Sequence, residues 1–385
     1  MMLEKKKDVR KTFISLVAVA LFLALVLVLD QVIKPSNKMY MLLTVLQKGS
    51  VYALAAVSMN LLNGFTGLFS LGHAGFMLIG AYTYAIFSIP AASRDTVYQY
   101  YDAAIRISFP EVLGNALGGF GTVLGVIICV LLAGLMASLF AYLIGLPVLR
   151  LKSDYLAIAT LGFAEIVRAI FQWGKLGPVT NGSNLLKSFT RISNFKIGTF
   201  SMSTFVPVLI ATVSIILIVM LVNSTYGRAF KAIRDDEVAA EAMGINLAKH
   251  KRMAFIISSF FAGVGGGMLA MYMGAVSALS FKSTMTYEIL LIVVIGGIGS
   301  ISGSVLTSFL YVASLEWLLR GLDSGTFLGI NAPGLFKNGF RMAVVSVIIM
   351  VVVLFFRKGI MGDKELPDLF KKKPSRKMKK EVAAK

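Results

Sequence analysis

The sequence is dominated by long apolar runs separated by shorter polar segments. Such runs are found near residues 12–33, 39–61, 66–89, 117–147, 155–173, 203–223, 253–275, 286–299, 303–320 and 340–356. Most of them approach the roughly 20 residues that a helix needs to cross a bilayer. With 57% hydrophobic residues and a mean hydropathy of +0.80, the chain carries more apolar surface than a soluble domain can bury. We therefore predict an all-α polytopic membrane protein with about ten transmembrane helices.

Basic residues are concentrated in the segments that flank these runs. Four segments with more Lys and Arg than Asp and Glu are 1–11, 150–154, 224–252 and 357–385. Because cytoplasmic segments of membrane proteins are rich in Lys and Arg, we predict that these segments and both termini are cytoplasmic. The predicted outer loop 174–202 also carries four basic residues, so it obeys the charge rule imperfectly.

An even number of crossings requires that residues 286–320 form two spans. We predict a break at Gly296–Gly303, where the sequence reads GGIGSISG. The run 286–299 is short for a full crossing and is also compatible with a re-entrant segment. The predicted divisions are a basic N-terminus with the first transmembrane helix (1–38), a helical bundle with a cytoplasmic loop at 224–252 (39–356), and a basic cytoplasmic tail (357–385).

The net charge of +19 is compatible with nucleic-acid binding, but the basic residues flank apolar runs and form no separate basic domain. They are well placed to contact anionic lipid headgroups, so we predict the lipid bilayer as a partner and no nucleic acid. Cys129 is the sole cysteine, and His73 and His250 are the two histidines. This composition argues against a disulfide framework and against a metal site.

One polar segment, Gly227–Gly244, stands between two apolar runs. Asp235 or Asp236 is suited to cap the N-terminus of a helix whose first turn holds Glu237. Gly244 is suited to the left-handed position that ends a helix. We predict a helix of about eight residues, roughly 12 Å long, that a partner outside the bilayer can grasp.

Three glycine clusters fall at membrane depth, namely Gly64–Gly75, Gly263–Gly267 and Gly296–Gly303. The pairs Gly263/Gly267 and Gly299/Gly303 have the GxxxG spacing that permits close helix packing, and Gly296 is assigned to the same packing role. The alternative is a set of broken helices that line a solute path, because irregular backbone survives in a membrane only where protein or water satisfies it. The first cluster best supports this alternative. Its candidate path residues are Gly67, Ser70, Gly72 and His73.

Glu165 and Arg168 lie inside a predicted span, three positions apart and therefore on one helix face. A charge at this depth usually faces the bundle interior together with a partner. Two interpretations remain open: the pair fixes helix packing, or it forms a polar part of the translocation path. Glu316 and Arg320, near a predicted outer end, are expected to form a simple surface pair.

The sequence contains no GxxxxGK[ST] motif, so the chain has no phosphate-binding P-loop of its own. No nucleophile with a neighbouring base and no pair of catalytic carboxylates can be recognised either. We predict that the chain is not an enzyme and holds no cofactor. Any ATPase that drives it is then a separate chain, which would bind at the loop 224–252.

Several motifs follow one another along most of the chain. They are NGFTGLFSLGHAG at 63–75 with GAY at 80–82, YLAIATLGFAEIVR at 155–168, TNG at 180–182, the segment 227–245, and GGIG at 296–299 with Gly303. Through them, residues 40–360 or so resemble the permease subunits of branched-chain amino acid ABC importers, specifically the larger, M-type permease. The lysine-rich C-terminus departs from the pattern of this family.

The resemblance implies a type II importer-like permease bundle in a bacterial-type cytoplasmic membrane. The implied partners are a second homologous permease, two ABC ATP-binding subunits that hold ATP and Mg, and a periplasmic or extracellular protein that delivers leucine, isoleucine, valine or a related amino acid. The residues that it implies for coupling to the ATPase are Arg234, Asp235, Asp236, Glu237, Glu241 and Gly244. The alternatives are a urea or amide ABC permease, or an ion-coupled secondary transporter that uses Glu165 and Arg168 as a relay.

Overall fold

The computed structural model describes most of the chain as far as residue 319 and isolated parts beyond it. The described residues are 2–33, 39–151, 153–194, 196–197, 200–319, 326–327, 330–331, 343–344, 346–347, 350, 359–362 and 365. Most of the last predicted span, 340–356, and most of the predicted tail, 357–385, lie outside them, as does Arg320.

The described residues are mainly helical. The helices are α1 (Met2–Val32), α2 (Tyr40–Asn60), α3 (His73–Ser88), α4 (Arg94–Val97), α5 (Phe109–Val148), α6 (Ser153–Gln172), α7 (Gly177–Thr180), α8 (Phe205–Asn223), α9 (Thr225–Asp235), α10 (Glu237–Ala242), α11 (Leu247–Met273), α12 (Ser283–Gly296) and α13 (Ile301–Ala313). The 3₁₀ turns are η2 (Ala91–Ser93), η3 (Gly174–Leu176), η4 (Ile192–Asn194) and η5 (Ala278–Ser280), and the π-helical turns are η1 (Leu61–Phe65) and η6 (Ser314–Leu318).

Each of the first nine predicted apolar runs overlaps a helix in this part of the chain. Six helical segments are long and apolar enough to cross a membrane, or seven if the bent pair His73–Ser88 and Ala91–Val97 is one span. Within the described residues the structure therefore has six or seven candidate spans, and the predicted total of about ten stays a prediction because most of 340–356 lies outside them. The run predicted at 286–299 belongs to the helical segment Ala278–Gly296, which is long and apolar enough for a full crossing.

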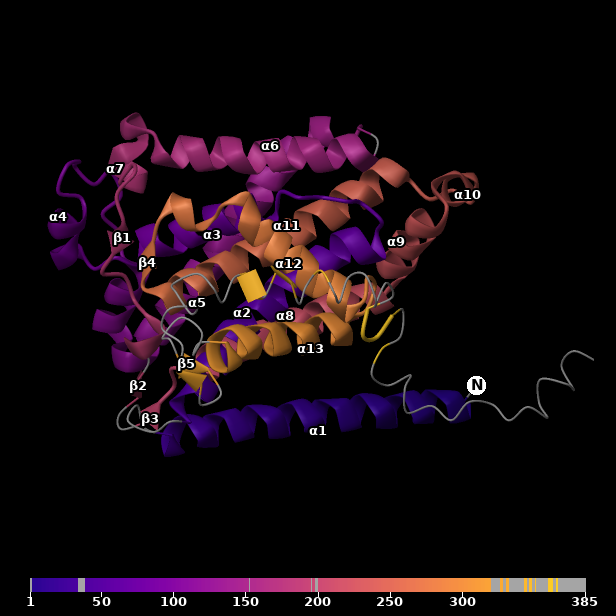
Figure 1. The fold of residues 1–385 in the computed structure, drawn as a ribbon, viewed down its shortest axis with the longest axis horizontal. Coiled ribbons are helices and arrows are strands. Elements are labelled where there is room, and N and C mark those ends of the chain that lie inside the picture. The colour runs from indigo at the N-terminus through magenta and orange to yellow at the C-terminus, as the bar shows by residue number, and fades with distance from the viewer. Residues whose placement is uncertain are drawn as a thin grey trace, which may run out of the picture.

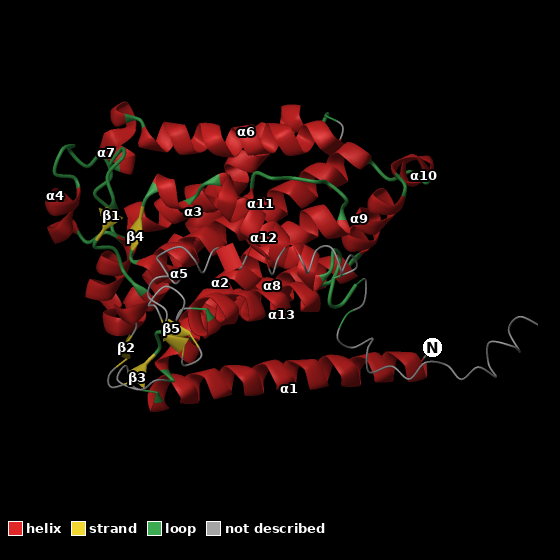
Figure 2. Cartoon of the chain, in the orientation of Figure 1, coloured by secondary structure: helices red, strands yellow, loops and turns green. Residues whose placement is uncertain are grey.

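The long helices run side by side along the longest axis of the molecule (Figure 1). The polar helices α9 and α10 lie at one end, where α1 also begins, and we call this the α10 end. The short helices α4 and α7 and the strands gather at the opposite end, the strand end (Figure 2). The N-terminal segment and the loop 224–252, both predicted to be cytoplasmic, therefore lie at the same end of the molecule.

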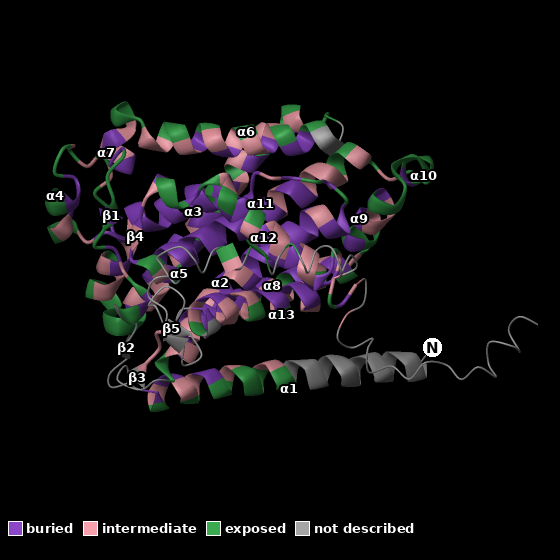
Figure 3. Cartoon of the chain, viewed as in Figure 1, coloured by how far each residue is buried: buried purple, intermediate pink, exposed green. Residues whose placement is uncertain are grey.

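Burial separates central helices from peripheral ones (Figure 3). Every residue of α3 is buried except Phe87. In their most apolar stretches, 78% of α11 and 72% of α2 is buried inside the chain, against 28% of α6. The core therefore consists of α2, α3 and α11, and α6 lies at its edge.

Glycine allows the backbones of the central helices to touch. A methyl group at Gly80 of α3 would lie 2.1 Å from the carbonyl oxygen of Gly263 in α11, and one at Gly263 would lie 2.6 Å from the carbonyl oxygen of Ala133 in α5. Gly267 is less crowded, with its nearest neighbours at 3.4 Å. These approaches are of the kind that small residues permit between membrane helices.

The third predicted span, 66–89, is not one continuous helix. α2 ends in the π-helical turn η1, residues 66–72 are non-helical, and α3 begins only at His73. After α3 the chain bends by 105° into the short helices that follow. The glycine-rich motif therefore makes a helix break inside the protein.

Three antiparallel strand pairs qualify the all-α prediction. They are β1 (Leu186–Lys187) with β4 (Ala275–Val276), β2 (Lys196–Ile197) with β3 (Phe200–Ser201), and β5 (Thr326–Phe327) with β6 (Ile330–Asn331). Each strand has two residues, too few for the alternation of side chains that would reveal a strand in the sequence. They connect loops and leave the fold a helical bundle.

The glycine contacts give a first prediction. Gly80→Ala and Gly266→Ala should destabilise the packing of α3 on α11, since each new methyl group would lie 2.1 or 2.0 Å from a backbone oxygen of the facing helix. Overpacking of this kind costs about 1–3 kcal/mol, so the melting temperature of the purified protein in detergent should fall. Gly265→Ala is the matched control, because the nearest atoms lie 3.9 Å from its added methyl group. Equal melting temperatures for all three variants would contradict this packing.

Candidate functional site

The polar segment at the α10 end forms two short helices joined at a capping residue. Asp236 separates α9 from α10, and its carboxylate accepts from Val238 N at 2.8 Å and Ala239 N at 3.0 Å. This identifies Asp236, of the two aspartates considered, as the N-cap. α10 has six residues, so the prediction of about eight was too long.

The end of α10 has the geometry expected of a glycine-terminated helix. Gly244 has φ = +84°, Gly244 N donates to Glu241 O at 2.9 Å, and Ile245 N donates to Ala240 O at 3.1 Å. These two bonds form the Schellman motif, which satisfies carbonyls at the helix end. The predicted left-handed position at Gly244 is therefore confirmed.

α10 presents an apolar surface to solvent. Val238 is 78% exposed and Met243 is 83% exposed, and Ala239 and Ala242 are exposed beside them. We call these four residues the α10 patch. The Glu241 side chain is also exposed. Glu237 lies beside it and pairs with Lys251 of α11 at 2.6 Å. A rim of charge beside exposed apolar side chains is typical of a protein-binding surface.

Arg234 connects this element to the bundle. Its Nη1 donates to the carbonyl oxygen of Gly64 at 3.2 Å, and its side chain pairs with Asp235 at 2.9 Å. A methyl group at Gly67 would lie 3.1 Å from Arg234 Cγ, and one at Gly299 would lie 3.2 Å from Arg234 Nη1. Arg234 therefore lies where the π-helical end of α2, the non-helical stretch after it and the turn between α12 and α13 meet.

Asn60 joins the α12–α13 turn to the end of α2. Its Oδ1 accepts from Gly299 N at 2.8 Å, and its Nδ2 donates to Ser300 O at 2.9 Å and to Ser304 Oγ at 2.8 Å. Asn60 lies outside the motifs that the sequence offers as candidate sites. Its only signal in the sequence is an amide inside a mostly apolar run, and the structure buries it.

Beyond this turn, α12 and α13 stay close at their Gly296 and Gly303 ends. A methyl group at Gly303 would lie 2.1 Å from Gly296 O. The two glycines thus lie face to face across the hairpin, and a side chain at either one would separate the helices.

The candidate path residues of the first glycine cluster are held by protein groups. Asn63 accepts from Ser70 N at 3.2 Å, and a methyl group at Gly72 would lie 2.9 Å from Thr160 O of α6. His73 is buried, with its Nε2 2.8 Å from Ser58 Oγ. Leu71 N donates to Thr160 Oγ1 at 3.0 Å. The break is packed and hydrogen-bonded inside the protein, as irregular backbone in a membrane requires.

Glu165 and Arg168 are only partly buried, although charges in a span were expected to face the bundle interior. Arg168 Nε donates to Glu165 Oε2 at 2.7 Å, so the pair itself is formed. The glutamate and arginine side chains are 36% and 25% exposed, and α6 lies at the edge of the bundle (Figure 3). The sequence reveals that the two residues share a face but not which way that face points.

Glu316 has a partner on another helix, while its expected partner Arg320 lies outside the described residues. It pairs with Lys48 of α2, and Tyr52 donates to Glu288 of α12 at 3.3 Å. Lys48 lies 5.9 Å from the ring centroid of Tyr52. The Lys48–Glu316 pair thus joins two elements far apart in the sequence, which spacing within one segment cannot reveal.

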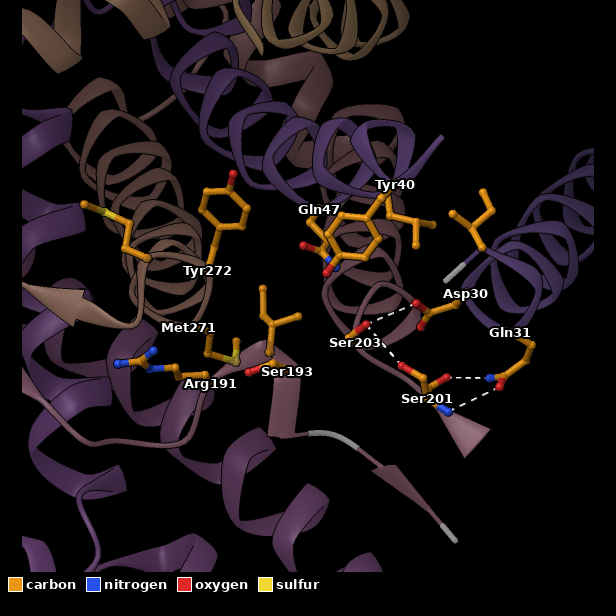
Figure 4. A pocket seen from close by; sticks show the side chains of 14 residues that line it. Asp30, Gln31, Tyr40, Gln47, Arg191, Ser193, Ser201, Ser203, Met271 and Tyr272 are labelled. Carbon is orange, nitrogen blue, oxygen red and sulfur yellow. Dashed lines mark hydrogen bonds between the residues drawn. The ribbon is translucent and has the colours of Figure 1, made fainter. Parts of the chain in front are cut away.

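A cavity of about 540 Å³ lies at the strand end between α1, α2, α11 and the segment around β3 (Figure 4). Asp30 of α1 accepts from Ser203 Oγ at 3.1 Å and Thr204 N at 2.9 Å, and Gln47 donates to Thr204 Oγ1 at 2.9 Å. Arg191 lines the opposite side, as the figure shows. None of the predicted path residues lines this cavity.

Comparison with known families decides the class of protein to which these features belong. The family described as "Branched-chain amino acid transport system / permease component" matches residues 41–356. The chain belongs to this permease family. The membrane permease and transport class predicted from the sequence is therefore confirmed.

Individual relatives agree with this assignment. The chain is 31% identical over 305 residues to the high-affinity branched-chain amino acid transport system permease protein LivM of Salmonella typhimurium, which covers 72% of the chain and 63% of that protein. It is 32% identical over 303 residues to LivM of Escherichia coli, with the same coverage. It is also 24% identical over 325 residues to the LivH permease of Salmonella typhimurium, covering 83% of the chain and 93% of that protein.

The matches to these two LivM proteins span 63% of their length. No solved structure matches the chain significantly.

Proposed function

We propose that the chain is the M-type permease subunit of an ABC importer that moves leucine, isoleucine, valine or related amino acids across the cytoplasmic membrane. The observation that carries this proposal is the exposed helix α10, joined through Arg234 to Gly64 and the helix breaks of the bundle. Such an element can receive a movement outside the bilayer and pass it inward. Membership of the branched-chain amino acid permease family supports the substrate class.

The energy source is proposed to be a separate pair of ABC ATP-binding subunits that hold ATP and Mg. The sequence has no P-loop, which is consistent with hydrolysis elsewhere. The residues proposed to form or position the coupling surface are Arg234, Asp235, Asp236, Glu237, Glu241, Gly244 and the α10 patch. In this arrangement the permease performs alternating access, and closure of the ATPase dimer moves α10.

The orientation follows from the same assignment. We place the α10 end in the cytoplasm, together with both termini, in a type II importer-like bundle with ten spans. The start of α1 at the α10 end and the basic residues of segments 1–11 and 224–252 support this orientation. The strand end then faces the periplasmic or extracellular binding protein, and the cavity between Asp30 and Arg191 opens a candidate route for solute on that side.

A second, homologous permease is proposed to cover the outward face of α6. An isolated charge at the centre of a membrane helix costs about 2.5–3.5 kcal/mol on insertion scales, so the partly exposed pair Glu165–Arg168 favours cover by protein. Gly162 on the same helix has no atom within 4 Å of an added methyl group, which leaves a notch for a neighbouring helix. The similarity of the chain to LivH as well as LivM proteins supports a homologous partner.

The translocation path is proposed to pass Gly67, Ser70, Gly72 and His73 and the Glu165–Arg168 pair, where α3 meets α6. The contact of Gly72 with Thr160 supports this position.

The rival function, an ion-coupled secondary transporter, would need Glu165 and Arg168 as a relay. Their mutual pairing at 2.7 Å and the presence of α10 favour the ABC importer.

Purification and transport test the function directly. The chain purified from native membranes should bring with it a P-loop ATPase and a second permease. The complex should be reconstituted in vesicles with ATP on the side of the membrane that the α10 end faces and the binding protein on the other side. Leucine should then accumulate on the ATP side, and a protonophore should not prevent this accumulation. Uptake that requires a proton gradient and ignores ATP would reject the proposal in favour of the secondary transporter. Uptake of urea or short amides in place of leucine would reject branched-chain amino acids as the substrate class in favour of amides.

The α10 patch gives a sharper prediction. Met243→Glu places a charge on the exposed apolar surface and should lower solute-stimulated ATP hydrolysis by about tenfold or more, as interface residues worth about 1–2 kcal/mol do. Met243→Leu keeps the apolar surface and is the matched control. Both variants should melt at the wild-type temperature, since the side chain is exposed. Unchanged coupling in Met243→Glu would exclude the patch as the docking surface.

The α6 face gives a separate prediction. Gly162→Trp fills the open notch and should reduce the amount of second permease that copurifies with the chain, without lowering the yield of the chain itself. Met220→Trp, at a 64% exposed position on α8, places the same bulky side chain elsewhere on the bundle and should have no such effect. Equal loss of the partner in both variants, or in neither, would contradict the α6 interface.

A further inference from the structure

Residues 359–362 and Glu365, which we call the C-terminal brace, return to the α12–α13 turn. They lie beyond residues 41–356, the part of the chain that matches the permease family. Ile360 N donates to Ile295 O at 2.7 Å, and Met361 N donates to Gly296 O at 3.2 Å. The brace thus supplies donors to carbonyl groups at the C-terminal end of α12, which a helix end leaves without partners.

Glu365 binds the N-terminal end of α13, which follows the same turn. Its Oε1 accepts from Ile301 N at 2.7 Å, and its Oε2 accepts from Ser302 N at 2.9 Å and from the Ser302 hydroxyl. These amides open α13, and the third is taken by Ser300 Oγ, which accepts from Gly303 N at 3.1 Å. A carboxylate at a helix N-terminus is favoured both by these bonds and by the helix dipole.

The fit of the brace depends on glycine. Gly297 has φ = +117°, and a methyl group there would lie 2.5 Å from Gly362 O. A methyl group at Gly359 would lie 2.7 Å from Val294 O. The backbone of the brace therefore packs directly against the backbone of the turn, with no side chain between them.

The same turn also meets the coupling element. Gly299 N donates to Asn60 Oδ1 at 2.8 Å, and the Cβ position of Gly299 lies 3.2 Å from Arg234 Nη1. Four residues, Gly297–Ser300, thus separate α12 from α13 and contact both the brace and the pair Asn60 and Arg234. A displacement of Arg234 therefore acts on a turn that the brace also contacts.

We propose that the C-terminal brace is a positioning device for coupling: Glu365 holds the α12–α13 turn against Arg234, so that movement of α9 and α10 reaches the helix breaks. This inference rests on the proposed function, because it requires an ATPase that moves α10. It assigns a role to a segment outside the matched family region. Without Glu365, movement of Arg234 displaces the turn alone, and less solute is moved for each ATP hydrolysed.

The test measures solute taken up per ATP hydrolysed by the complete complex with its binding protein in proteoliposomes. Glu365→Ala should lower this ratio about fivefold, which corresponds to the low end of usual coupling energies. Glu365→Gln keeps one acceptor oxygen and should give a smaller loss. Asp368→Ala, which removes a carboxylate three residues further along the chain, is the matched control and should leave the ratio unchanged.

Assembly and melting temperature are measured on the same preparations. A lower melting temperature with an unchanged ratio in Glu365→Ala would reduce the brace to a purely structural contact and overturn the proposal. An equal fall of the ratio in Asp368→Ala would assign the effect to the charge of the tail and overturn it too. A wild-type complex that shows no solute-stimulated ATP hydrolysis would instead reject the proposed function, so the two failures are distinguishable.

Discussion

The requirement that every backbone polar group inside a membrane find a partner governs this structure. Continuous helices meet it by themselves, but this chain interrupts its helices at residues 66–72 and at the α12–α13 turn. At the first break, Asn63 and Thr160 provide the missing hydrogen bonds. At the second, Asn60 and Glu365 provide them. At both breaks, polar side chains therefore supply the partners that the interrupted backbone lacks.

The two breaks are neighbours in space because Asn60 and Arg234 connect them. Asn60 binds the α12–α13 turn, and Arg234 binds Gly64 while lying against Gly67 and Gly299. Sites that are far apart in the sequence thus share one polar junction at the α10 end. A rearrangement that begins at α10 would reach both helix breaks through this junction, as the proposed transport mechanism driven from outside the membrane requires.

Local features of the structure could be predicted from the sequence. The helix cap at Asp236 and the left-handed Gly244 follow from interactions within a few residues, and the separation of α12 from α13 follows from a Gly- and Ser-rich run. Features set by packing between distant segments could not be predicted. The partial exposure of Glu165 and the pairing of Glu316 with Lys48 depend on which helices meet, and the periodicity and spacing within one segment do not reveal these neighbours. Asn60 and Glu365 are single polar residues with no motif around them.

The contact between Gly80 and Gly263 has a consequence for how the bundle can rearrange. Where helix backbones touch, neither helix can slide or roll without collision, because no flexible side chain lies between them to change its rotamer. We therefore expect the helices α3, α5 and α11 to move together as one rigid body. Opening and closing of a route through the protein would then fall to the helices around this unit, such as α6 and α12, which pack against α3.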